Sequence, residues 1–164
     1  MHKFPYLKNV YHFTATLAGI GLIPFAPGTF GSIVAWLIFV FISHLVSTSS
    51  MLILTIISIF FAVWICEKAS KELIEKDHKA IVIDELAGMW LALIPVLYIA
   101  SDQYGRTFYA VSALILFRVF DILKPYPISY FDQKIKNGFG IVLDDLIAGI
   151  FAGSLSTLIV IFLI

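Results

Sequence analysis

The sequence has little charge and only one cysteine, and each shortage excludes a class of protein. Charged residues make up 13% of the 164 residues, whereas ordinary soluble domains carry about 25%. The formal net charge is zero, so nothing in the charge balance indicates a nucleic-acid partner, and no protein partner is predicted. Cys66 stands alone, which excludes an intrachain disulfide and a cysteine metal cluster.

Apolar residues are abundant instead. They make up 60% of the chain, and the mean hydropathy is +0.98. These values predict an all-α integral membrane protein with a single domain over residues 1–164. The first 13 residues lack an uninterrupted apolar core and a small-residue cleavage site, so we expect no signal peptide.

The apolar residues gather in five blocks, which predict a bundle of about five membrane helices. Most blocks are slightly shorter than the ~20 residues that span a typical hydrocarbon core. Residues 67–80 have helical charge spacing and predict a cytoplasmic helical connector. Residues 10–25 contain glycines and Pro24, so they predict an interfacial or re-entrant segment. The five blocks are residues 32–47, 51–66, 86–100, 107–123 and 146–164.

The order of the blocks predicts which residues meet. If all five span, the starts of the first, third and fifth blocks share one membrane face with the ends of the second and fourth. Most basic residues fall on that face, which the positive-inside rule assigns to the cytoplasm. Only Arg106 falls on the opposite face, against Lys68, Lys71, Lys76, Lys79, Arg118, Lys124, Lys134 and Lys136.

Two similar sequence motifs place paired acids on the face predicted to be cytoplasmic. IVIDELAG contains Asp84 and Glu85, and IVLDDLIAG contains Asp144 and Asp145. Capping of a helix N-terminus is one explanation for an acid there. Capping does not explain why two adjacent acids occur in both motifs, on the same face as Asp121, because neighbouring carboxylates repel one another. Mg²⁺ prefers such oxygen ligands, so these five acids predict a metal and substrate site.

Two further stretches predict anion-binding groups on the same face. FRVFDILKPYPI carries Arg118, Asp121 and Lys124, for which an intrahelical ion pair and a snorkelling lysine are the structural alternatives. IPFAPGTFGS offers Thr29 and Ser32 directly before an apolar helix. Such a turn can present N–H groups and hydroxyls to an anion, or it can be a capped turn with Ser32 or Thr29 as the N-cap. The small residues after each acid pair favour close helix packing.

Four motifs, in this order, resemble those of the bacterial phosphatidylglycerophosphatase A family: PFAPGTFGS, IVIDELAG, FRVFDILKPYPI and GFGIVLDDLIAG. The resemblance covers residues 19 to 153. It implies a Mg²⁺-dependent phosphatase that removes the terminal phosphate of phosphatidylglycerophosphate, yielding phosphatidylglycerol, in the bacterial inner membrane. The glycine-rich approach to the first motif is only partly matched, since residues 17–24 read LAGIGLIP.

The motifs and the resemblance together predict roles for nine residues. Five acids are expected to hold one or two Mg²⁺ ions and to act in catalysis: Asp84, Glu85, Asp121, Asp144 and Asp145. Arg118 and Lys124 are expected to bind phosphate oxygens, with Thr29 and Ser32 as further substrate contacts. Either a water or a carboxylate could attack phosphorus. Two alternatives are a small transporter coupled to cations or protons and a structural membrane subunit.

Overall fold

The computed structural model describes residues 3, 5–135 and 137–163, and every element among them is a helix. Lys136 and residue 164, which the sequence analysis assigns to the cytoplasmic face and to the last block, lie outside the described residues. The elements are α1 (Val10–Ala15), the 3-10 turn η1 (Ile20–Leu22), α2 (Pro27–Ser43), α3 (Thr48–Glu72), α4 (Ile83–Leu93), α5 (Val96–Ile99), α6 (Gln103–Leu123), α7 (Ile128–Lys134) and α8 (Gly138–Leu163).

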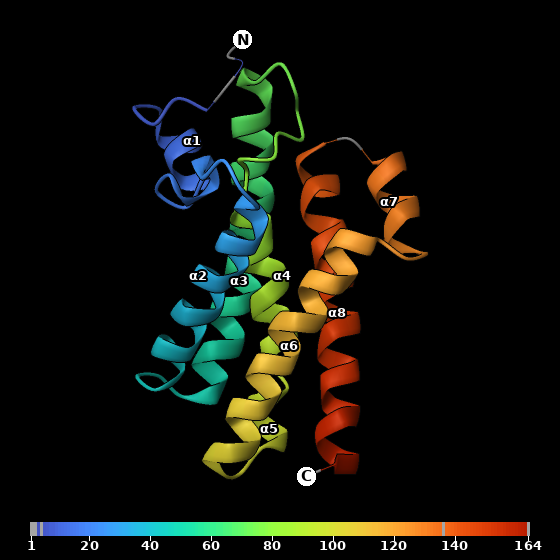
Figure 1. The fold of residues 1–164 in the computed structure, drawn as a ribbon. Coiled ribbons are helices and arrows are strands. Elements are labelled where there is room, and N and C mark those ends of the chain that lie inside the picture. Colours follow the sequence, from blue (N-terminus) through green and yellow to red (C-terminus); the bar gives the residue numbers. More distant parts are fainter. Residues whose placement is uncertain (1–2, 4, 136, 164) are drawn as a thin grey trace.

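Helices α2, α3, α4, α6 and α8 run along the long axis of the molecule with alternating direction (Figure 1). The starts of α2, α4 and α8 therefore lie at the same end as the ends of α3 and α6. The predicted alternation is confirmed, and it brings distant parts of the sequence together. Helix α1 and the end of α8 lie at opposite ends of the bundle in Figure 1.

Helix α4 forms the centre of the bundle, where it packs against α2, α3, α6 and α8. Nearly all of its residues are buried, as expected for a helix that is apolar on all sides beyond its first turn. Small residues allow α4 and α8 to approach closely. A Cβ on Gly149 would collide with the carbonyl oxygen of Gly88, and one on Gly88 would lie 2.6 Å from the carbonyl oxygen of Asp145. The predicted small-residue packing is confirmed.

We expect Gly88→Ala to destabilise the protein by about 1–3 kcal/mol, the usual cost of overpacking. The added methyl would also lie 2.8 Å from Cε2 of Phe117, so α4 and α8 would have to separate. Thermal unfolding in detergent, followed by circular dichroism, measures the effect. Ser154→Ala, at an exposed position of α8, is the control. Equal midpoints for the two variants would contradict the close approach.

Two helices among the described residues, α3 and α8, are long and apolar enough to cross a membrane, and α2 is a shorter apolar helix. Each predicted block lies mainly in helical structure, but α4 ends at Leu93, before Pro95, and α6 carries charged residues. Five spans therefore stay a prediction. Large apolar side chains are exposed around the bundle, including Leu37 of α2, Phe60 of α3 and Leu158 of α8. Such an apolar surface is typical of membrane contact.

The predicted connector is helical only in part. Residues 67–72 extend α3, but the chain becomes extended at Leu73 and no helix covers residues 73–80. Just after this segment, the amide of Val82 donates to the carbonyl of Ala15 at 2.8 Å. This bond ties the segment to α1 and lets the chain reverse into α4. The prediction of a helix over residues 73–80 is therefore wrong.

Other boundaries also differ from those of the apolar blocks. Helix α2 begins at Pro27 rather than at residue 32, and α8 begins at Gly138 rather than at residue 146. Residues 10–25 form only α1 and η1, separated by left-handed backbone at Leu17, Ala18 and Gly19. This interruption fits the prediction of a segment that does not span.

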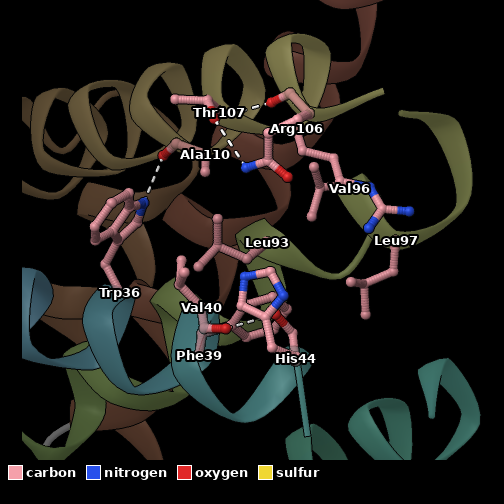
Figure 2. Close-up of a pocket in the computed structure, with 12 residues that line it drawn as sticks. Trp36, Phe39, Val40, His44, Leu93, Val96, Leu97, Arg106, Thr107 and Ala110 are labelled. Carbon is pink, nitrogen blue, oxygen red and sulfur yellow. Dashed lines mark hydrogen bonds between the residues drawn. The ribbon is translucent and has the colours of Figure 1, made fainter. Parts of the chain in front are cut away.

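The end of the bundle that contains Arg106 holds a mostly apolar pocket of about 110 Å³ (Figure 2). The indole nitrogen of Trp36 donates to the carbonyl of Ala110 at 2.8 Å, which joins α2 to α6. Arg106 Nε donates to the carbonyl of Ala100 at 3.0 Å and closes the turn between α5 and α6. The predicted catalytic acids lie at the other end.

Candidate active site

The five predicted acids come from three helices and line one cavity of about 210 Å³. Asp84 and Glu85 lie in the first turn of α4, and Asp121 lies near the end of α6. Asp144 and Asp145 lie in the second turn of α8. Because that helix begins at Gly138, capping does not account for this pair. The topology therefore brings together acids that are far apart in the sequence.

Burial makes this concentration of acids costly. The exposed fraction is 8% for Asp84, 8% for Glu85, 7% for Asp144 and 3% for Asp145. Ionised carboxylates at such depth need partners. Six acidic side chains line the cavity but only three basic ones do: Asp77, Asp84, Glu85, Asp121, Asp144 and Asp145 against Lys79, Arg118 and Lys124. The cavity therefore has an excess of negative charge that a cation would relieve.

Oxygen atoms of the acids are close enough to share a cation. One oxygen each from Asp84, Glu85 and Asp145 lie within 4.8 Å of one another, and the same holds for Asp121, Asp144 and Asp145. Asp145 belongs to both groups. Among the described residues, Glu85 Oε2 and Asp144 Oδ1 are buried without a hydrogen-bond partner. These residues fit Mg²⁺, because it prefers oxygen ligands and is commonly held by carboxylates.

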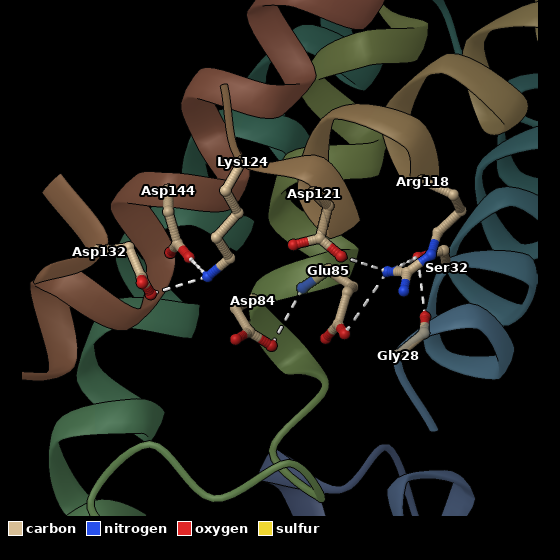
Figure 3. A network of polar contacts seen from close by, with 9 residues as sticks. All are labelled: Gly28, Ser32, Asp84, Glu85, Arg118, Asp121, Lys124, Asp132 and Asp144. Atoms are coloured by element: carbon tan, nitrogen blue, oxygen red, sulfur yellow. Dashed lines mark hydrogen bonds and ion pairs between the residues drawn. The ribbon is translucent and has the colours of Figure 1, made fainter. Parts of the chain in front are cut away.

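Arg118 forms a polar network on one side of the cavity (Figure 3). Its Nη1 donates to Asp121 Oδ2 at 2.6 Å and to Ser32 Oγ at 3.3 Å, and lies 3.9 Å from Glu85 Oε1. The intrahelical pair with Asp121 is therefore present. The contacts to α2 and α4 go beyond that pair and hold the guanidinium in the cavity wall.

Lys124 forms a second network, on the other side of the acids (Figure 3). It ends α6 in a left-handed conformation, and its Nζ donates to Asp144 Oδ2 at 2.6 Å and to Asp132 Oδ1 at 2.7 Å. Burial alone would lower the pKa of Lys124, but these two carboxylates raise the pKa above its usual value. The ammonium group is therefore charged and belongs to the site.

The first turn of α2 reaches the cavity through its backbone. A Cβ on Gly28 would collide with Glu85 Oε1 and lie 3.2 Å from both terminal nitrogens of Arg118. Any side chain at this position would therefore require the ends of Glu85 and Arg118 to shift. Ala26, and not Ser32 or Thr29, is the N-cap of α2, so the alternative of a turn capped by Ser32 or Thr29 is wrong.

The two predicted hydroxyl contacts lie in different places. Ser32 is fully buried, and its Oγ donates to the carbonyl of Gly28 at 2.8 Å while it accepts from Arg118. It therefore positions the arginine from α2. Thr29 lines a neighbouring groove between α2 and α6. A direct contact of either hydroxyl with substrate stays a prediction.

Sequence reasoning did not assign site roles to Asp77, Lys79 or Asp132. Asp77 and Lys79 line the cavity from the segment between α3 and α4. Their closeness in sequence to Asp84 is the signal that could have indicated them. Asp132 lies on α7 and reaches Lys124 because the chain folds back after Pro125. No spacing in the sequence indicates that contact.

The chain is similar to known proteins over most of its length. A model of the phosphatidylglycerophosphatase A family matches residues 13–160. The phosphatidylglycerophosphatase A of Haemophilus influenzae is 41% identical over 148 residues, which are 89% of this chain and 86% of that relative. The enzyme of the same name from Escherichia coli is 30% identical over 152 residues, which are 91% of this chain and 83% of that relative.

A further relative carries a different name. A Bacteroides thetaiotaomicron protein, provisionally named a phosphatidylinositol-3-phosphatase, is 31% identical over 138 residues, which are 82% of this chain and 83% of that relative. No solved structure matches the chain. The family match covers all five acids, both cations and the first turn of α2. The chain therefore belongs to the phosphatidylglycerophosphatase A family.

Proposed function

We propose that this chain hydrolyses the terminal phosphate monoester of phosphatidylglycerophosphate with Mg²⁺, releasing phosphatidylglycerol and inorganic phosphate for phospholipid biosynthesis. The observation that carries the proposal is the meeting of two buried acid pairs, Asp84 with Glu85 and Asp144 with Asp145, in a cavity that Arg118 also lines. The names of two relatives, from H. influenzae and E. coli, supply the substrate. The phosphatase class follows from the family.

The five acids would hold the metal, with Asp145 at the centre because it belongs to both oxygen groups. A bound Mg²⁺ would stabilise the negative charge that develops on the phosphate oxygens during hydrolysis. The guanidinium of Arg118 would orient the same phosphate, a planar donor suited to two oxygens at once. Lys124 would hold Asp144 in place through its 2.6 Å hydrogen bond and add positive charge.

The reaction breaks the bond between phosphorus and the glycerol oxygen of the headgroup. In the simplest course, a water oxygen forms the new bond to phosphorus, one carboxylate takes the water's proton, and the glycerol oxygen leaves with a proton. A carboxylate of the site could instead attack phosphorus first. One displacement inverts the configuration at phosphorus and two successive displacements retain it, so hydrolysis of a substrate made chiral at its terminal phosphate separates these two courses.

We also propose a multi-pass position in the bacterial inner membrane with the acidic cavity at the cytoplasmic face. Three arguments support it: the apolar surface around the bundle, the two helices long enough to span, and the bias of lysines toward the end with the cavity. A site at the membrane interface suits a lipid phosphatase, because its substrate presents a phosphate at the interface and acyl chains in the bilayer.

Removal of the metal tests the proposed function. We expect detergent-purified protein to release phosphate from phosphatidylglycerophosphate in Mg²⁺ and to lose at least about 99% of that activity in excess EDTA, because the buried acids then lack their counter-ion. Added Mg²⁺ should restore the rate. Undiminished hydrolysis in EDTA would contradict the metal. No hydrolysis by well-folded protein in Mg²⁺ would contradict the substrate.

A parallel assay with phosphatidylinositol-3-phosphate tests the headgroup, since one relative is named for it. We expect kcat/KM to be higher for phosphatidylglycerophosphate. A clear preference for the inositol lipid would support the phosphatase activity but contradict phosphatidylglycerophosphate as the substrate.

A further inference from the structure

An apolar groove runs beside the acidic cavity, between α2 and α6. Its volume is about 510 Å³, which is within the range of about 300–1,000 Å³ for ligand pockets. Thr29 and Ile33 of α2 form one wall, and residues of α6 form the other: Leu114, Ile115, Arg118, Val119, Ile122 and Leu123. The groove is apolar except at Thr29 and Arg118.

Arg118 separates the groove from the cavity, because the same side chain lines both. Its Nη1 points to the acidic cavity, where it donates to the carboxylate of Asp121 and to the hydroxyl of Ser32. A ligand whose phosphate contacts this guanidinium therefore has the groove directly beside it. This continuity distinguishes the groove from the other apolar surfaces of the bundle.

The groove also runs in the direction expected for the acyl chain of a lipid. It extends from Leu123, at the end of α6, to Leu114, a distance of roughly 14 Å along the helix. It thus starts at the polar end of the bundle and continues toward the middle. Ile115 and Ile122 are 58% and 66% exposed, so their side chains are open to a chain lying along α6.

We propose that this groove holds one acyl chain of the lipid substrate while the headgroup extends past the side chain of Arg118 into the acidic cavity. This inference rests on the proposed function. An acyl chain gains little from leaving other lipid, since a bilayer is already apolar. The benefit is positional: a chain fixed in the groove aligns the phosphate with the acids, and alignment affects the rate strongly.

Filling the groove tests the inference. We expect Ile115→Trp to lower kcat/KM for phosphatidylglycerophosphate by about tenfold or more, because the displaced chain misaligns the phosphate. Hydrolysis of the deacylated headgroup, glycerophosphoglycerophosphate, should not change. The matched control is Ile57→Trp on α3, where the isoleucine is 55% exposed and lies outside the groove lining; it should leave both rates unchanged.

The other outcomes are distinguishable. An unchanged rate for Ile115→Trp with the diacyl substrate would overturn the inference and leave bulk lipid as the occupant of the groove. An equal loss on both substrates would overturn it too, because the damage would then lie at Arg118. If the wild-type protein hydrolyses neither substrate, the proposed function itself fails.

A measurement without turnover covers the case in which the deacylated headgroup is too poor a substrate. An analogue of phosphatidylglycerophosphate with a photoreactive acyl chain should crosslink to peptides of α2 and α6 in the wild-type protein. Ile115→Trp should reduce this labelling, and Ile57→Trp should not. Equal labelling of α3 and α6 would overturn the inference.

Discussion

Asp145→Asn should reduce phosphate release by roughly 10²- to 10⁴-fold, the range for loss of a positioned acid or base. Asp145 is 3% exposed and belongs to both groups of oxygens that can share a cation. Asn keeps the shape but removes the charge, so it weakens both groups at once. Asp84→Asn should act in the same direction but less strongly, because Asp84 belongs to one group only.

Stability separates a catalytic role of these acids from a structural one. Without metal, adjacent buried carboxylates repel one another, so we expect Asp145→Asn to unfold at the same temperature as the wild type or higher. Asp102→Asn is the control, since Asp102 caps α6 at the other end of the bundle and Asn caps equally well. A catalytic role would be contradicted if Asp145→Asn were much less stable than the wild type and its loss of activity matched the loss of folded protein.

Arg118→Gln should lower kcat/KM by roughly 10²- to 10³-fold, the usual effect of removing a donor that stabilises developing charge. The guanidinium contacts Asp121, Glu85 and Ser32, so its position is set from three helices. Arg118→Lys should recover little of the activity, because an ammonium cannot bind two oxygens in one plane. Steady-state kinetics of both variants provide the measurement.

Controls for Arg118 must separate charge from position. Arg106→Gln removes a cation at the opposite end of the molecule, where Arg106 Nε donates to the carbonyl of Ala100, and should leave kcat/KM unchanged. Near-normal activity of Arg118→Lys would contradict the planar contact and leave only a requirement for positive charge. Circular dichroism of each variant shows whether the loss of activity follows unfolding.

Much of the site could be predicted because it depends on topology. Alternating apolar blocks require the paired acids and Arg118 to meet at one end, whatever the details of packing, and the structure places them around one cavity. The side-chain periodicity of a helix likewise places Arg118 beside Asp121. These inferences need only the order of the helices and the positions of the charges.

The remaining features depend on contacts that leave no local pattern. The carboxylate of Asp132 meets Lys124 only because α7 folds back over the site. Residues 73–80 carry helical charge spacing, yet they form no helix, and the chain just after them is tied to α1 by the bond from Val82 to Ala15. Gly28 reads as a turn residue, whereas its role is to bring the backbone against Glu85 and Arg118. Tertiary contacts decide each of these cases.

Binding of a divalent cation to the resting protein tests the central claim most directly, since it needs no substrate. Mn²⁺ prefers the same carboxylate ligands as Mg²⁺ and is detected by electron paramagnetic resonance. We expect the wild type and Asp102→Asn to bind Mn²⁺, Mg²⁺ to displace it, and Asp145→Asn to bind at least about tenfold more weakly. Equal binding by all three proteins would contradict a metal site built from these acids.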